Sequence, residues 1–220
     1  MQAEILNCAL FRGMTPEEVA SLLRCLQARQ AFYPKNTMVF RMGEPISEVG
    51  VVLSGVVHVV REDFWGNRNI LAEQLPGDLF GESYAGAGET LSDVSVIVDR
   101  DAEILFLQLS RLLHTCRDSC DFHARLIRNL LFILSEKNLR LSKKLGHMSK
   151  RTTRDKLLSY LSEQAHRAGG RQFTIPYNRT KLAEYLSVDR SAMWVELCRM
   201  REEGLLDFER NRFTLHELSH

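Results

Sequence analysis

The sequence predicts an α+β protein with an N-terminal β-barrel, a long central helix and a C-terminal helical part that ends in a small hairpin. Three observations lead to this prediction. Short alternating strands between glycine turns fill residues 32–107, an apolar heptad runs through residues 121–148, and two short amphipathic helices occupy residues 179–204. Strands and helices in separate stretches are typical of the α+β class. A chain of 220 residues is long enough for one large domain or two small ones.

The first part begins with a predicted helix and then changes to strands. Thr15 is the expected N-cap, Pro16 lies in the first turn, and Glu18 completes a capping box. We expect Ser54-Gly55 to turn a hairpin. Period-two patterns between turn residues predict strands at 38–40, 49–53, 56–60, 70–74, 94–98 and 103–107. Many short strands at about ten-residue spacing favour a barrel or a sandwich.

A heptad of apolar residues predicts that the central helix joins two copies of the chain. The seam residues recur in steps of four and three: Ile127, Leu131, Leu134, Asn138, Leu141 and Leu145. This period is typical of a coiled coil, in which one polar seam residue such as Asn138 fixes register and oligomeric state. Packing within a single chain is the alternative, because Leu126, Leu130 and Ile133 form a second apolar stripe.

Residues 179–205 have the pattern of two helices joined by a tight polar turn. Asp189 is placed to N-cap the second helix, and Gly204 to end it. The predicted buried faces comprise Leu182, Ala183 and Leu186 in the first helix, and Met193, Leu197 and Met200 in the second. The alternation at 206–208 and 213–215 predicts a hairpin after them. This order is typical of a winged helix-turn-helix, whose second helix enters the major groove of DNA.

Polar and aromatic side chains on these helices are the candidate DNA contacts. Arginine pairs with guanine through two hydrogen bonds, so Arg190 is expected to read a base. Lys181 is expected to contact phosphate, which carries no sequence information. The full set of expected contacts is Arg179, Thr180, Lys181, Arg190, Ser191, Trp194 and Arg199.

The overall net charge of +1 hides opposite charges in the two halves of the chain. Residues 1–136 contain 12 Lys+Arg and 18 Asp+Glu, whereas residues 137–220 contain 17 and 10. This asymmetry favours two domains, of which only the second approaches phosphate. The densest basic run either contacts the flanks of DNA or forms a solvated helix face: Lys137, Arg140, Lys143, Lys144, Lys150, Arg151, Arg154 and Lys156.

The sequence also bears on location. No apolar run approaches the roughly 18 residues needed to span a membrane. The first residues, Met-Gln-Ala-Glu, lack the features of a signal peptide. The five cysteines are an odd number, and without an export signal reduced thiols are the simpler expectation. We therefore expect a cytoplasmic protein with no membrane partner.

Five motifs in order resemble those of the Crp/Fnr family of bacterial transcription regulators. They are the segments 43–47, 51–57, 76–82, 180–183 and 188–192. The resemblance covers nearly the whole chain. It implies an effector-sensing β-barrel of the cyclic-nucleotide-binding-like jelly-roll type at 1–120, a dimerisation helix at 121–148, and a winged helix-turn-helix DNA-binding domain at 149–220.

The chain departs from the family at the place of the ligand phosphate. Members that bind cyclic nucleotides carry Arg-Ser/Thr-Ala where this chain has Ser92-Asp93-Val94. The family's arginine neutralises the cyclic phosphate, and Asp93 has the opposite charge. We therefore expect neither cyclic AMP nor cyclic GMP to bind in the usual way. The resemblance implies that an effector pocket, suited to a small anionic or phenolic molecule, is lined by Gly81, Glu82, Ser83, Tyr84, Ser92, Lys137 and Asn138. A barrel without an effector is the alternative.

A second departure concerns the DNA sequence. Many relatives present an arginine, then Ser or Glu, then a second arginine five positions after the first. Arg190 and Ser191 match, but the third position is Val195. The half-site therefore cannot be taken from relatives. Trp194 or Val195 contacts a thymine methyl, or Trp194 packs against the hairpin.

Other sensor types fit the sequence less well. An iron–sulfur cluster needs grouped cysteines, and a haem needs an axial ligand for which His58 is the barrel candidate. We expect no cofactor and no metal. A metal or redox site on a helix remains the alternative, formed from His114, Cys116, Cys120 and His123.

The sequence thus predicts a ligand-responsive transcription regulator that binds a near-palindromic DNA site as a homodimer and has RNA polymerase as a further partner. Alternatives are a redox- or metal-responsive regulator of the same fold and a ligand-binding module that does not bind DNA. No Ser-His-Asp set, glycine-rich phosphate loop or paired carboxylates occur, so we do not expect an enzyme.

Overall fold

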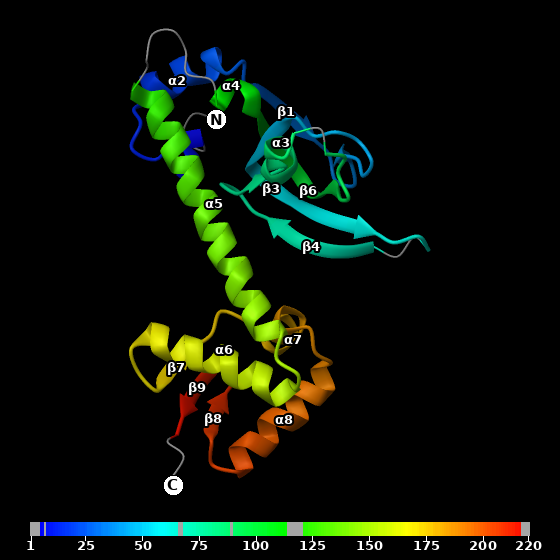
Figure 1. Cartoon of the computed structure of the whole chain (residues 1–220), viewed down its shortest axis with the longest axis vertical. Coiled ribbons are helices and arrows are strands. Elements are labelled where there is room, and N and C mark those ends of the chain that lie inside the picture. The colour runs from blue at the N-terminus through cyan, green and yellow to red at the C-terminus, as the bar shows by residue number, and fades with distance from the viewer. Residues whose placement is uncertain (1–4, 7, 66–67, 89, 114–120, 217–220) are drawn as a thin grey trace. The chain divides into compact units, whose positions relative to one another are not determined.

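The computed structural model describes residues 5–6, 8–65, 68–88, 90–113 and 121–216, in two compact units (Figure 1). The units are Met1–Leu134 and Ser135–His220, and the helix α5 (Asp121–Met148) contributes residues to both. This long helix matches the one predicted at 121–148. Within the described ranges, no helix is both long enough and apolar enough to cross a membrane.

The first unit is built on a six-stranded antiparallel sheet. Its elements are η1 (Ala9–Phe11), α2 (Pro16–Cys25), β1 (Arg29–Tyr33), β2 (Met38–Phe40), β3 (Glu48–Glu62), β4 (Arg68–Gln74), β5 (Leu79–Phe80), α3 (Glu82–Gly86), β6 (Ser95–Gln108) and α4 (Leu109–Leu113). The strand order is β1-β6-β3-β4, with β2 on β6 and β5 on β3. The predicted capping box is confirmed, since Thr15 and Glu18 each hydrogen-bond the other's backbone N–H, at 2.9 and 3.3 Å.

The predicted hairpin at Ser54-Gly55 is wrong, because β3 runs unbroken through it. Gly55 has φ +83°, and a Cβ there would lie 2.1 Å from the carbonyl oxygen of Asp101. The pairing of β3 with β6 shifts register on both sides of this glycine, which marks a bulge that bends the strand without reversing it. The strands predicted at 94–98 and 103–107 are likewise one strand, β6.

The described strands do not close into the predicted barrel. The two halves of β3 have different partners instead: Gly50 and Val51 pair with β5, whereas residues 57–62 pair with β4. This arrangement is of the jelly-roll type. A Cβ at Gly50 would lie 2.2 Å from the ring of Phe80, so glycine is required where these strands meet.

The first part of α5 packs on the core of this unit. Leu126 and Leu130 are 0% and 5% exposed and join a cluster with residues of α2 and β3. Ile127 and Leu134 are half-buried against the same cluster. Packing within the chain, the alternative set against a seam between two copies, therefore exists for this part of the helix.

The second unit combines helices with a three-stranded sheet. Its further elements are α6 (Thr153–Ala168), β7 (Gln172–Thr174), α7 (Arg179–Leu186), α8 (Arg190–Glu202), β8 (Leu206–Glu209) and β9 (Arg212–Leu215). The strand order is β7-β9-β8. The two predicted helices, their buried faces and the hairpin are confirmed. The sequence patterns did not reveal β7, which pairs with β9 and extends the hairpin to three strands.

Candidate nucleic-acid interface and effector region

The turn between α7 and α8 is fixed by side-chain and backbone caps. Asn178 Oδ1 accepts a hydrogen bond from the Lys181 N–H at 2.9 Å, and Asp189 Oδ1 accepts one from the Ala192 N–H at 2.8 Å. Ser187 ends α7 in the left-handed region with φ +50°. The second helix therefore leaves the turn in a defined direction, as a helix-turn-helix requires.

One face of α8 is exposed and the other is buried. Met193, Leu197 and Met200 are at most 1% exposed and form the core-facing stripe. The exposed residues of α8 include four that the sequence directed to DNA or to its base pairs: Arg190, Ser191, Val195 and Arg199. Arg199 lies 4.0 Å from Glu196, an exposed contact that costs little to exchange for a phosphate. This face can therefore enter a groove without unfolding the helix.

The first turn of α7 exposes the other expected contacts, Arg179, Thr180 and Lys181. The Arg179 guanidinium carbon lies 3.7 Å from the ring centroid of Trp194. The Trp194 ring also packs edge-to-face on Phe208 of β8, with 5.4 Å between centroids. Of the two roles expected for Trp194, the structure thus contains the packing against the hairpin.

Half of the basic run is engaged inside the second unit, which the sequence did not reveal. Arg154 makes ion pairs with Glu196 and Glu203, and its hydrogen bond lowers the pKa of the Glu203 carboxyl. Lys156 Nζ donates to the carbonyl oxygens of Leu186 and Ser187 at 3.2 and 3.3 Å. These two cations stabilise the helix-turn-helix from within, so neither open reading of the run describes them.

Two more basic residues of the run lie near the end of α5. Lys143 Nζ lies 2.8 Å from Glu163 of α6, and Lys144 lies over the Tyr185 ring at 5.6 Å. Burial raises the pKa of the Glu163 carboxyl, but the hydrogen bonds from Lys143 and His147 outweigh this and lower it.

A cluster of aromatic side chains lies beside them. The rings of Tyr160, Tyr177 and Tyr185 have centroids 5.0–6.2 Å apart. The Tyr160 ring is 2% exposed, and burial raises the pKa of its hydroxyl. In the part of the chain that the structure describes, this hydroxyl has no hydrogen-bond partner.

The expected effector residues of the first unit gather around the short helix α3. Gly81 caps the helix with φ +81°, and Ser83 is exposed. Ser92 is 3% exposed, but its hydroxyl donates to the Val94 carbonyl oxygen at 2.7 Å and accepts from the Val94 N–H at 3.2 Å. The Ser92 side chain thus holds its own turn together.

Beside this turn, one carboxylate joins three segments of the unit. The hydroxyl of Tyr84 and the guanidinium of Arg61 both donate to Asp93. The hydrogen bond from Tyr84 lowers the pKa of Asp93, with a smaller contribution from Arg61, and burial and Asp93 together raise the pKa of Tyr84. The sequence gave no sign of Arg61, which approaches from the end of β3.

The remaining effector residues, Lys137 and Asn138, lie on the part of α5 that belongs to the second unit. Their place in an effector pocket stays a prediction. The same holds for the dimer seam. Leu131, Leu141 and Leu145 are 63%, 66% and 68% exposed, so this apolar edge has no cover within the chain.

The predicted metal or redox site falls largely outside the described residues, which exclude His114, Cys116 and Cys120. Its fourth member, His123, is buried, and its Nε2 lies 3.9 Å from the sulfur of Cys25. Among the residues that the structure describes, no three His, Cys, Asp or Glu side chains are grouped to hold a metal.

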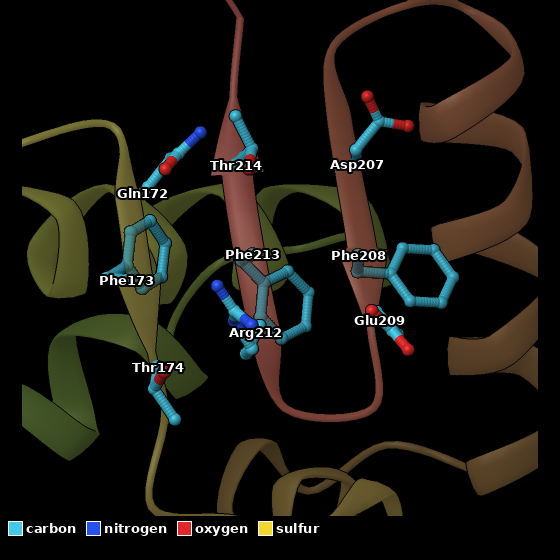
Figure 2. A pocket seen from close by; sticks show the side chains of 9 residues that line it. All are labelled: Gln172, Phe173, Thr174, Asp207, Phe208, Glu209, Arg212, Phe213 and Thr214. Atoms are coloured by element: carbon cyan, nitrogen blue, oxygen red, sulfur yellow. The ribbon is translucent and has the colours of Figure 1, made fainter.

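The three-stranded sheet of the second unit carries a hollow of about 490 Å³ that the sequence did not predict (Figure 2). Registered rows of polar residues cross the sheet, among them Thr174, Arg212 and Glu209. Figure 2 shows Phe208 turned toward the neighbouring helix, away from Phe173. Two carboxylates, Asp207 and Glu209, line the hollow and make it unsuited to phosphate.

Comparison with known protein families divides the chain in the same way. Residues 30–119 match the model of a cyclic nucleotide-binding domain. Residues 155–220 match that of a Crp-like helix-turn-helix domain. The two matches have the order that the sequence motifs implied.

Individual relatives agree. A CRP-like cAMP-activated global transcriptional regulator of Mycobacterium tuberculosis is 30% identical over 110 residues, which are 46% of this chain and 48% of that protein. The chain thus spans about half the length of that curated relative. The nitrogen fixation regulation protein FixK of Azorhizobium caulinodans is 24% identical over 217 residues, 93% of this chain and 82% of that one. A structure of CprK complexed with OCPA has a TM-score of 0.66 at 16% identity over 90% of each chain, which supports the fold alone.

Proposed function

We propose that this chain, which belongs to the Crp/Fnr family of bacterial transcription regulators, is a homodimeric DNA-binding regulator that responds to a small molecule other than cyclic AMP. The observation that carries this proposal is the capped turn between α7 and α8, with an exposed polar face on α8. A second helix so held is the element that reads the major groove in helix-turn-helix proteins.

Affinity for DNA comes mainly from phosphate contacts, and specificity from base contacts. Lys181 and Thr180, in the first exposed turn of α7, are assigned to phosphate. Arg190 and Ser191, in the first turn of α8, are assigned to base edges. The basic charge of residues 137–220 supports this division, although Arg154 and Lys156 are used internally.

The test is a binding titration of the full chain against sites selected from random DNA, at several salt concentrations. Arg190→Ala is expected to relax the preference at one base pair of each half-site, and Lys181→Ala to weaken all sites alike. Uniform weakening by both variants would contradict the assignment of Arg190. Binding that does not depend on salt would contradict DNA recognition and favour a ligand-binding module that does not bind DNA.

The homodimer is proposed from the exposed edge of α5. Leu131, Asn138, Leu141 and Leu145 follow the heptad and are all exposed. A strip of leucines at this period is buried in stable helices by a partner helix. Leu141→Glu combined with Leu145→Glu is expected to yield monomers in analytical ultracentrifugation. A matched control is Lys144→Glu combined with Lys137→Glu, which changes charge on the same helix outside the seam.

The effector is proposed to differ from the cyclic nucleotide of the M. tuberculosis relative. Asp93 presents its negative charge to Tyr84 and Arg61, so a phosphate would compete with a carboxylate for the same donors. A neutral or phenolic molecule near Tyr84, Ser83 and Glu82 avoids that competition. Lys137 and Asn138 are proposed to complete the pocket.

Calorimetry with cyclic AMP and cyclic GMP tests this part. Neither is expected to bind with a dissociation constant in the nanomolar to low micromolar range, and tight binding of either would overturn it. A thermal-shift screen of metabolites and phenols, followed by DNA titration with each hit, identifies the effector. Bound effector is expected to shift the population between two orientations of the recognition helices.

Cytoplasmic location, a near-palindromic site and contact with RNA polymerase follow as further proposals from family membership. A redox-responsive regulator remains a second candidate, favoured by the 3.9 Å approach of the Cys25 sulfur to His123. Loss of DNA binding on oxidation, retained in Cys25→Ser, would count against that role for Cys25.

A further inference from the structure

The outward face of α8 has an apolar centre. Ser191, Val195 and Arg199 follow one another at four-residue steps, so they lie along one side of the helix. All three are exposed, Val195 by 63%. The middle of the face that would enter a groove therefore carries an isopropyl group, which can neither donate nor accept a hydrogen bond.

The neighbouring Trp194 is not available for the same task. Its ring is held from two sides within the second unit, by the edge-to-face contact with Phe208 and by the Arg179 guanidinium 3.7 Å from its centroid. Turning the indole toward a groove would break both contacts. Between the two residues that the sequence left open for an apolar base contact, the structure favours Val195.

We propose that Val195 is the residue that selects one base pair of each half-site, by contact with the 5-methyl group of a thymine. This inference rests on the proposed DNA-binding function and specifies what one position of the site contains. Thymine is the base that offers an apolar group in the major groove.

The other bases fit this place poorly. Guanine offers acceptors, cytosine an amino donor and adenine both. Each of these groups would lose water under the side chain of Val195 and find no partner there. Arg190, one turn earlier and also exposed, has the donors for a guanine. We therefore expect a half-site that contains a thymine set by Val195 near a guanine set by Arg190.

The test uses the full chain and a duplex site selected from random DNA. Each thymine is replaced in turn by deoxyuridine, which removes the methyl group and leaves every hydrogen-bonding group of the base in place. Affinity is measured by fluorescence anisotropy at fixed salt. For the unchanged chain, one thymine position in each half-site is expected to lose about fourfold in affinity on replacement, the value of one buried methyl group.

Variants at one residue then assign the effect. In Val195→Ala the thymine and deoxyuridine sites are expected to bind within about a factor of two of each other, because the shorter side chain does not reach the methyl group. Val195→Ile keeps the preference. Since Val195 is exposed, these changes leave the core of the unit intact, which circular dichroism checks. The other thymines of the site are internal controls.

Three results would overturn the proposal. One is a site in which no thymine responds to removal of its methyl group. Another is a response that persists in Val195→Ala and disappears in Trp194→Phe, which would assign the contact to the indole. The last is the absence of any salt-dependent DNA binding, which would overturn the proposed function as well. The first two leave DNA binding intact, so the two failures are distinguishable.

Discussion

His147 joins the end of α5 to α6 through Glu163, with 2.9 Å between Nε2 and Oε2. Its other ring nitrogen, Nδ1, lies 2.9 Å from the hydroxyl of Ser159. A carboxylate only accepts, so Nε2 carries the proton that Glu163 receives. Both polar atoms of a side chain that is only 5% exposed are therefore satisfied within the second unit. Sequence patterns did not indicate this contact, although it fixes the helix that leads into the helix-turn-helix.

We expect His147→Ala to lower the free energy of unfolding of the second unit by about 2–4 kcal/mol, because it leaves a cavity and removes two buried hydrogen bonds. The measurement is urea unfolding followed by the fluorescence of Trp194, in a Trp65→Phe background. His216→Ala is the matched control. That histidine pairs with Asp207 at the surface with 41% of its side chain exposed, so the loss should stay under about 0.5 kcal/mol. Equal losses in the two variants would contradict the structural role of His147.

Lys156 and Lys181 are expected to separate stability from DNA affinity. Lys156 donates to two carbonyl oxygens at the end of α7, so Lys156→Met should destabilise the second unit by about 1–2 kcal/mol. Its plot of log affinity against log salt should keep the slope of the unchanged chain. Lys181→Ala should leave stability nearly unchanged and reduce that slope by about 0.9, the value of one phosphate contact. A reduced slope in Lys156→Met would instead place Lys156 on DNA.

These contacts show where prediction from the sequence succeeds and where it stops. The start of α2 was predictable because Thr15 and Glu18 complete their capping box within one turn. The bend of β3 was not, because Gly55 becomes a bulge only when the backbone of Asp101 lies against it. A glycine beside a serine reads locally as a turn. Its effect on the strand depends on a partner far along the chain.

The candidate site divides in the same way. The alternation of buried and exposed residues along α8 follows from helical period, so the exposure of Arg190 and Ser191 was predictable. The engagement of Trp194 by Phe208 depends on how the hairpin folds back on α8. Pairs such as Arg61 with Asp93 join distant segments, and no local pattern marks them.

Tyr160→Phe is expected to leave the second unit as stable as before or to stabilise it by up to about 1 kcal/mol. The hydroxyl of Tyr160 is buried without a partner among the described residues, so its removal relieves a desolvation cost and breaks no hydrogen bond. Urea unfolding monitored as above provides the measurement. A loss of more than about 1 kcal/mol would show that the hydroxyl has a partner in solution, such as a buried water.

The carboxylate of Asp93 gives a prediction in acid. Its pKa is lowered from the ordinary value of 3.8, first by the hydrogen bond from Tyr84 and then by Arg61. A group whose pKa is lower in the folded chain stabilises that state above its unfolded value and loses this contribution as pH falls through the folded value. The contribution of Asp93 should therefore be complete above about pH 4 and vanish in stronger acid. Carboxyl carbon NMR of the full chain measures this titration directly.

Tyr84→Phe should raise the pKa of Asp93 toward its ordinary value, because the phenol is the first cause of the shift. Arg61→Met should raise it by less. The reciprocal change is also expected, since Asp93 helps to hold the Tyr84 pKa above its ordinary value of 10.0. Asp93→Asn should move the absorbance titration of Tyr84 to lower pH, although burial keeps part of the shift. If the Tyr84 titration stayed where it is in Asp93→Asn, the two side chains would not be hydrogen-bonded in solution, and the argument that Asp93 competes with an anionic effector would lose its basis.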